Sequence, residues 1–178
     1  MKSPVGRMRV GSLANRKNNM LITDINSPER ESYARVADLR RLANKRGEPL
    51  PEEDAACETL LIKAMDYLAG LNWQGERTTA FQPLAWPRSG VIFDGYLLPK
   101  ECIPSQVLQA QCRLALAAQA IDLTPSFSGG KEVIQESVSG AISVTYASGS
   151  ASSPHFSWLP GLLHGLLISS CQIQLVRG

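Results

Sequence analysis

The chain has 178 residues, of which 44% are hydrophobic and 19% charged, and its formal net charge is +2. This balance is typical of a folded domain rather than a disordered chain. Residues 1–19 carry five bases and no acid, so the remaining 159 residues carry 13 bases and 16 acids, a net charge of −3. Composition therefore argues against a dedicated nucleic-acid-binding domain, which usually has a basic face on its folded body.

The sequence also argues against membrane insertion and secretion. The longest apolar stretch, residues 158–168, is broken by Pro160 and two glycines and is shorter than the roughly 20 residues of a membrane helix. Residues 1–19 contain no apolar signal segment. The four cysteines, at positions 57, 102, 112 and 171, show no CxxC spacing, so we expect free thiols in a reducing compartment.

The predicted elements begin after a basic leader, residues 1–19, which lacks periodicity and is expected to be disordered. Helical spacing of apolar residues predicts a first helix over 36–45, which Gly47 would end. A second helix is predicted to start at Pro51, with three acids in its first turn that complement the helix dipole, and to close at Gly70.

Residues 71–100 are predicted to form a long packed loop, because prolines break any regular element there. Its expected anchors are aromatic: Trp73, Phe81, Trp86, Phe93 and Tyr96. A third helix, rich in alanine, is predicted from about Pro104 to Asp122.

A period of two then predicts a β-hairpin over about 132–146, turning at Ser139–Gly140. A short apolar helix is expected around 158–167, and alternation in 171–176 predicts a strand available to another chain. The predicted fold is mainly α: a small bundle of three to four helices with one β-hairpin, a long packed loop and extended terminal arms. The predicted organisation is a leader (1–19), a helical domain (20–168) and a C-terminal arm (169–178).

No catalytic, metal-binding or cofactor-binding residues are identified. His155 and His164 are the only histidines, and no neighbouring acid or GxSxG turn accompanies them. Dispersed cysteines and two histidines give no metal-ligand spacing. We therefore expect a protein that is not an enzyme and carries no cofactor.

One part of the sequence resembles a known family. The segments WQGER (73–77), QPLAWPRSGV (82–91), DGY (94–96) and IPSQV (103–107) resemble tailed-phage head-completion, or head-to-tail adaptor, proteins, which are often labelled DnaT-like single-stranded-DNA-binding proteins. The resemblance spans roughly residues 20–168. The residues that carry its motifs are Trp73, Gly75, Arg77, Leu84, Trp86, Pro87, Arg88, Gly90, Asp94, Gly95 and Pro104.

The resemblance implies structural roles for these residues. Pro87 and Gly90 would fix a turn, Trp86 would be buried under the helices, and Arg88 would make a fork-like set of hydrogen bonds with a carboxylate or with backbone carbonyls. The leader 1–19 and the residues after Ser169 do not map onto the family's pattern.

The adaptor resemblance implies a virion protein of the head–tail junction, or neck, assembled in the host cytoplasm. It would form a ring, expected to be a dodecamer, between the portal protein and a tail or stopper (nozzle) protein, with double-stranded DNA passing through the lumen without sequence specificity. The residues expected to contact the portal or another partner are Cys171, Gln172, Ile173, Gln174, Leu175 and Val176. The alternative is a single-stranded-DNA-binding accessory protein of phage replication, with the leader and the aromatic loop as contacts.

Overall fold

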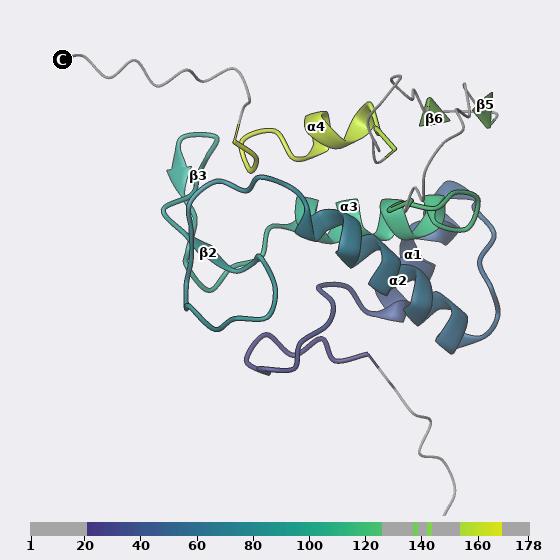
Figure 1. Ribbon diagram of the computed structural model, residues 1–178, viewed down its shortest axis with the longest axis horizontal. Helices are drawn as coiled ribbons and strands as arrows, with labels where there is room; N and C mark the ends of the chain where they lie inside the picture. Colours follow the sequence, from purple (N-terminus) through teal and green to yellow (C-terminus); the bar gives the residue numbers. More distant parts are fainter. Residues whose placement is uncertain (1–20, 126–136, 139–141, 144–153, 169–178) are drawn as a thin grey trace, which may run out of the picture.

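The computed structural model describes residues 21–125, 137–138, 142–143 and 154–168 (Figure 1). The fold is mainly helical with small antiparallel strand pairs, as predicted. The helices are α1 (Val36–Arg46), α2 (Asp54–Ala69), α3 (Ser105–Ala117) and α4 (Trp158–Leu162). The predicted leader and C-terminal arm lie outside the described residues.

Helix α1 confirms its predicted limits to within one residue. At its start the backbone N–H of Arg35 donates to Asp38 Oδ2 (3.1 Å), and at its end Gly47 takes the left-handed conformation, with φ of 68°. Glycine adopts this conformation without the steric cost that a Cβ would bring. The end of α1 is therefore set by its sequence.

Helix α2 begins at Asp54, so the predicted start at Pro51 is wrong. The guanidinium of Arg40 in α1 donates to the carbonyls of Pro51 (3.1 Å) and Glu52 (2.7 Å) and to Asp54 Oδ1 (2.8 Å). These bonds hold residues 51–52 against α1 in an extended approach to the helix. A side chain 11 residues upstream thus overrides the local helix-start signal.

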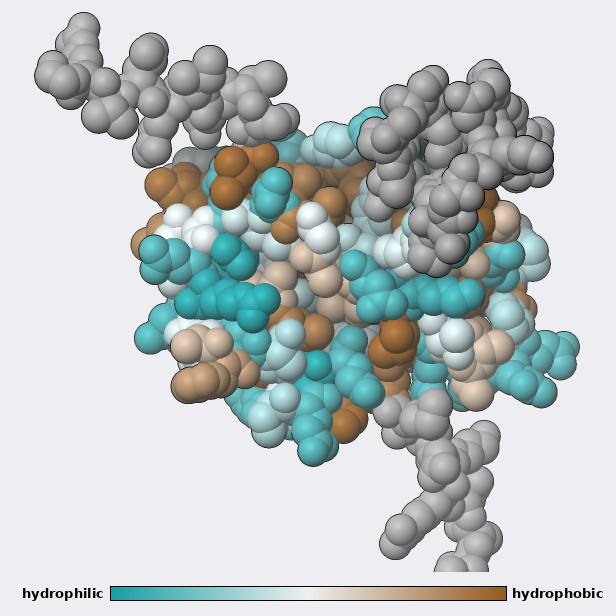
Figure 2. All heavy atoms as spheres, in the orientation of Figure 1, coloured by the Kyte–Doolittle hydropathy of each residue, from teal (hydrophilic) through white to brown (hydrophobic). Residues whose placement is uncertain are grey.

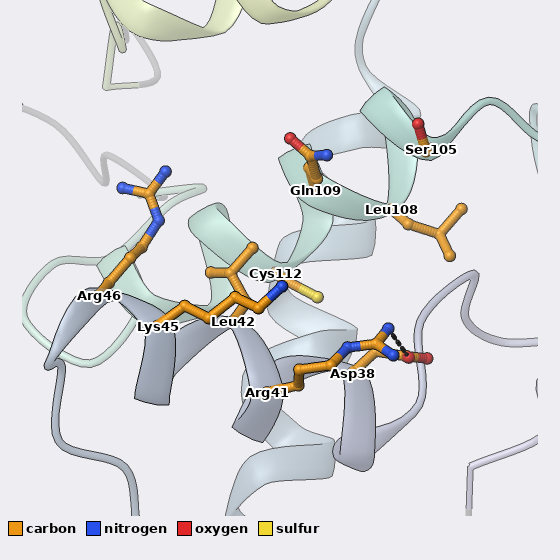
Figure 3. A pocket seen from close by; sticks show the side chains of 9 residues that line it. All are labelled: Asp38, Arg41, Leu42, Lys45, Arg46, Ser105, Leu108, Gln109 and Cys112. Atoms are coloured by element: carbon orange, nitrogen blue, oxygen red, sulfur yellow. Dashed lines mark hydrogen bonds and ion pairs between the residues drawn. The ribbon is translucent and has the colours of Figure 1, made fainter.

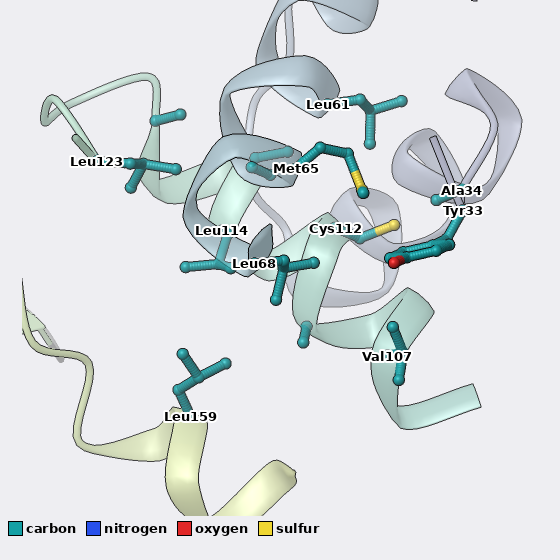
Figure 4. Packing of buried hydrophobic residues seen from close by; sticks show 14 of the residues in the cluster. Tyr33, Ala34, Leu61, Met65, Leu68, Val107, Cys112, Leu114, Leu123 and Leu159 are labelled. Atoms are coloured by element: carbon teal, nitrogen blue, oxygen red, sulfur yellow. The ribbon is translucent and has the colours of Figure 1, made fainter. Parts of the chain in front are cut away.

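Helix α3 lies at the centre of the molecule and packs most extensively against α2, with α1 and α4 on its other sides. Figure 4 shows the contact, in which Leu61, Met65 and Leu68 of α2 meet Cys112 and Leu114 of α3. The helix ends at Ala117, five residues before the predicted end, because Gln119 and Ala120 close tight turns onto the carbonyls of Leu116 and Ala117.

Residues 71–100 contain two short strand pairs that the sequence did not predict. Strand β1 (Glu76–Arg77) pairs with β2 (Arg88–Ser89), and β3 (Ile92–Phe93) pairs with β4 (Tyr96–Leu97). Asp94 and Gly95, with φ of 50° and 84°, make the turn between β3 and β4. Strands of two residues show no periodicity, so only the Asp-Gly turn signalled this hairpin.

The aromatic residues of this loop divide into two groups, so the prediction that all of them anchor it is wrong. Trp73 and Trp86 are buried and Phe93 is half-buried, whereas Phe81 and Tyr96 are 96% and 78% exposed. The ring centroids of Trp73 and Trp86 lie 5.7 Å apart, edge to face, within the core. Two aromatic side chains therefore fix the loop while two others remain at its surface.

The C-terminal part of the described chain contains one short strand pair and one short helix. The predicted hairpin is present as β5 (Ser137–Val138) paired with β6 (Ile142–Ser143); the rest of that prediction lies outside the described residues. The predicted helix over 158–167 is only the five residues of α4, and a turn at Gly165 (φ 77°) follows. No helix in the described ranges is long and apolar enough to span a bilayer.

Candidate nucleic-acid interface

A groove of about 520 Å³ separates the exposed sides of α1 and α3 (Figure 3). Helix α1 supplies one wall and helix α3 the other, although the two helices are about 60 residues apart in the sequence. The lining residues are Asp38, Arg41, Leu42, Lys45, Arg46, Ser105, Leu108, Gln109 and Cys112.

Three of the cations in the chain stand together on the α1 wall. Arg41, Lys45 and Arg46 follow helical spacing, so their side chains leave the helix on one side. Arg41 forms an ion pair with Asp38 at 2.7 Å and remains 69% exposed. Lys45 and Arg46 occupy the last turn of α1, where they complement the helix dipole. Neither forms an ion pair with a carboxylate of the described residues.

A fourth cation, Arg113 of α3, lies close to this group. Its guanidinium lies over the ring of Trp158 in α4, 3.7 Å from the ring centroid. The pKa of Arg113 is lowered by burial and, to a smaller extent, by the charge of Arg46. Two cations from different helices therefore repel each other, and an anion bound between them would relieve that repulsion.

The lining of the groove also includes apolar side chains and an unreactive thiol. Leu42 and Leu108 are the apolar members, and burial raises the pKa of the Cys112 thiol to about 12. A thiol with that pKa stays protonated at neutral pH and is not a nucleophile. No cluster of metal-ligand residues occurs in the part of the chain that the structure describes. The groove thus combines cationic side chains with apolar ones.

The residues singled out by the family resemblance do not line the groove; all lie in the 71–100 loop except Pro104, which precedes the groove residue Ser105. Arg88 donates hydrogen bonds to the backbone carbonyls of Gln74 (2.6 Å), Ala85 (3.2 Å), Trp73 (3.4 Å) and Gly75 (2.5 Å). The expected fork-like interaction is therefore present and its acceptors are carbonyls, not a carboxylate. Arg88 holds the two sides of the loop together.

Trp86 also has a structural position. Its side chain is 1% exposed, and its backbone N–H donates to the hydroxyl of Tyr33 (3.1 Å). The hydrogen bond from Trp73 Nε1 to the Leu68 carbonyl (3.1 Å) fixes its ring partner. These two indoles are thus not available to stack on bases, as the alternative interpretation of the loop required.

The remaining motif residues shape the turns. Gly75 and Gly90 have φ of 70° and 73°, Arg77 donates to the Gln82 carbonyl (3.1 Å), and Pro104 precedes α3 as its buried N-cap residue. The other motif residues are Leu84, half-buried against the core, Pro87, half-buried beside Trp86, and the Asp94–Gly95 turn.

The β3–β4 hairpin places apolar side chains at the surface. Ile92 and Leu97 are cross-strand partners and are 60% and 69% exposed, and Tyr96 adds a third exposed side chain. We call Ile92, Tyr96 and Leu97 the β3–β4 patch. Figure 2 shows hydrophobic surface on the side of the molecule where Figure 1 places β3. The sequence motifs give no signal for this patch.

The groove was not predicted from the sequence. Its only local signal is the helical spacing of Arg41, Lys45 and Arg46 within the predicted first helix and the residue after it. Only the position of α3 beside α1 turns that face of the helix into one wall of a groove.

A family model described as "Putative DnaT-like ssDNA binding protein" matches residues 19–178. The chain belongs to this DnaT-like family. The match confirms the DnaT-like part of the sequence-based resemblance, and it begins where the basic leader ends. It also extends to Gly178, so the residues after Ser169, which the motif comparison could not map, belong to the region that the family model covers. The chain matches no curated protein and no solved structure.

Proposed function

We propose that this DnaT-like protein is a single-stranded-DNA-binding accessory protein and that the α1–α3 groove holds the DNA backbone. The observation that carries the proposal is that Arg41, Lys45 and Arg46 line one groove together with apolar side chains, while Arg113 of a second helix lies within electrostatic range of Arg46. The family description supports the same class of ligand.

The charge distribution favours attraction of a polyanion to one groove rather than to the whole surface. Residues 21–125 and 154–168 hold 11 bases and 14 acids, a net charge of −3. Four of the 11 bases stand at or beside one groove, so a polyanion is attracted there and repelled elsewhere. Contacts with three or four phosphates of a single strand give a salt dependence with a slope of about −2 to −3 in log K against log salt.

The groove lacks the features of sequence-specific recognition. Trp158, the aromatic ring beside it, is already covered by Arg113, so bases would meet Leu42 and Leu108 rather than a stacking platform. We therefore expect modest affinity without sequence preference, and a protein that binds DNA without turnover or cofactor.

The test is fluorescence anisotropy of a labelled oligothymidine with the double variant Lys45→Ala/Arg46→Ala. Its matched control is Lys63→Ala/Lys100→Ala, which removes the same charge from exposed positions outside the groove. We expect at least tenfold weaker binding for the groove variant and a change of about twofold or less for the control, with a shallower salt slope only in the groove variant. Equal losses in both variants would refute the groove as the site.

A variant that lacks residues 1–19 separates the groove from the basic leader. The five bases of the leader lie within residues 1–18, outside the residues that the family model matches. If its removal abolishes binding while the groove variant binds normally, the leader and not the groove is the DNA contact.

A second candidate function is the head-to-tail adaptor of a tailed phage. The observation that favours it is the exposed β3–β4 patch on a body of net charge −3, because an assembly subunit needs apolar contact surfaces and a DNA channel should not grip phosphates. In this role the chain would form a ring, expected to be a dodecamer, in the virion neck. Its partners would be the portal, a tail or stopper protein, and double-stranded DNA in the lumen.

Electron cryomicroscopy of the purified virion neck tests this second candidate. Density for the chain in a ring against the portal, with residues 171–176 reaching the portal, would establish the adaptor role. Absence of the chain from purified virions would exclude it and leave the DNA-binding proposal alone.

A further inference from the structure

We propose that the β3–β4 patch binds residues 171–176 of a second copy of the chain. This interaction links neighbouring copies and does not depend on the groove or on DNA.

The patch has the geometry of a docking surface. Ile92 and Leu97 are directly opposite each other in the antiparallel register, so their exposed side chains share one face of the hairpin. A two-stranded sheet also has free backbone N–H and C=O groups along its edges, and an extended segment can pair with them. Exposed apolar side chains beside an open edge are the two requirements for adding a strand.

The direction of the last described residues bears on which copy supplies the segment. Gln74 N–H donates to the Leu166 carbonyl (2.9 Å) and Ile168 N–H donates to the Asn72 carbonyl (2.8 Å). From Leu166 to Ile168 the chain therefore runs antiparallel to residues 72–74 and away from β1, whose partner β2 leads into the hairpin.

The contact with the hairpin lies at the start of this run. A Cβ placed on Gly165 would lie 3.2 Å from the ring of Phe93 in β3, so the described run starts next to the hairpin. From there it proceeds along residues 74 to 72, away from β1. A neighbouring copy is the source of the segment that this direction of the described run favours.

The chemistry of the segment complements the patch. In an extended conformation Cys171, Ile173 and Leu175 share one side, opposite Gln172, Gln174 and Val176. Residues 169–178 contain one charge, Arg177, and residues 89–98 contain one charge, Asp94, of opposite sign. An apolar side faces an apolar patch, and the single charges attract.

Disulfide trapping between two full-length variants tests the proposal, because Cys171 is a native reporter in the segment. The donor carries Cys102→Ala, which removes an exposed thiol, and the acceptor carries Leu97→Cys, Cys102→Ala and Cys171→Ser. The other two thiols, Cys57 and Cys112, are buried. A disulfide between positions 97 and 171 can then form only between different chains.

The matched control is an acceptor with Phe81→Cys in place of Leu97→Cys, since Phe81 is apolar and 96% exposed but outside the patch. We expect mild oxidation to give a donor–acceptor disulfide, mapped by mass spectrometry, at least tenfold more often with the Leu97 acceptor. Equal yields from the two acceptors would overturn the proposal.

Sedimentation provides a readout without new cysteines. The full chain should show a concentration-dependent mass above that of the monomer, and both Leu97→Asp and Ile173→Asp should abolish it, whereas Phe81→Asp should not. Circular dichroism checks that each variant is folded. Because no DNA is present, and because Lys45→Ala/Arg46→Ala should associate like the wild type, failure here is distinct from failure of the DNA-binding proposal. A chain that stays monomeric and gives no Leu97-specific disulfide contradicts the inference.

Discussion

The side-chain oxygen of Gln111 accepts a hydrogen bond from the backbone N–H of Ala34 at 2.8 Å, across 77 residues of sequence. The same oxygen accepts from the Tyr33 N–H (3.1 Å), and the amide nitrogen donates to Ser32 Oγ (2.6 Å) and to the Leu61 carbonyl (3.2 Å). Gln111 is fully buried, so one amide joins α3 to α2 and to the segment before α1.

Replacing Gln111 with leucine should therefore be strongly destabilising. It leaves buried backbone N–H groups without acceptors, and each such group costs roughly 1–3 kcal/mol, so we expect a loss of about 3 kcal/mol in the free energy of unfolding. Urea denaturation measures it. Gln109→Leu, an exposed position on the same helix, should change stability by less than about 0.5 kcal/mol. Similar losses for both variants would contradict this role.

Gly75 and Gly90 allow a matched comparison of two residues with positive φ, 70° and 73°. A Cβ on Gly90 would meet nothing within 4 Å, so Gly90→Ala should cost only the backbone strain of about 1 kcal/mol. A Cβ on Gly75 would collide with the Ser89 carbonyl oxygen and with Val91. We expect Gly75→Ala to cost at least about 3 kcal/mol, measured by thermal or urea unfolding. Equal costs would show that β1 and β2 can separate freely.

Arg88→Lys should destabilise the loop although it keeps the charge. An ammonium cannot reproduce the planar fork that reaches four carbonyls, so several partly buried acceptors lose their donor. We expect a loss of about 2 kcal/mol and faster proteolysis within residues 71–100. Arg77→Lys, at an exposed residue with one such bond, is the control and should be nearly neutral. A neutral Arg88→Lys would mean that the carbonyls are satisfied in another way.

The buried Cys112 predicts a loss of stability in alkali. Burial raises the pKa of its thiol from the ordinary value of 9.0 to about 12, so the unfolded chain releases this proton at lower pH than the folded chain does. Its contribution is constant below about pH 9 and is lost as the pH rises from 9 towards 12. Urea denaturation at pH 8, 9.5 and 10.5 measures the slope.

Cys112→Ala should lower stability at every pH but reduce that slope. Part of the slope should remain, because burial also raises the pKa of Cys57, Tyr33 and Tyr67. An unchanged slope in the variant would show that the thiol does not titrate differently in the two states.

Local signals predicted those parts of the fold that depend on neighbouring residues. Gly47 marks the end of α1, and the Asp94–Gly95 pair, whose residue types favour a hairpin turn, sits at the turn between β3 and β4. The start of α2 could not be predicted in the same way, because it depends on Arg40 in another helix. Pro51 and the acids that follow it are residue types that favour a helix start, but the contact with Arg40 moves the start of α2 to Asp54.

The candidate site likewise has parts that local sequence signals predict and parts that depend on contacts between distant elements. The role of Arg88 in the loop could be anticipated from its chemistry and its surroundings in the sequence. The groove could not, because Arg46 and Arg113 meet only after α3 packs beside α1. The exposure of Ile92 and Leu97 could not be predicted either, because it depends on how the β3–β4 hairpin lies on the folded molecule.

The hydrogen bonds that Gln74 and Asn72 make with Leu166 and Ile168 have a consequence for synthesis of the chain. The 71–100 loop is held from upstream by the Tyr33 hydroxyl and from downstream by this last short run of residues. The loop therefore gains its second set of contacts only after residues 166–168 have been translated. Until then Trp73 lacks part of its cover, so a nascent chain stalled before Leu166 would present an indole to chaperones.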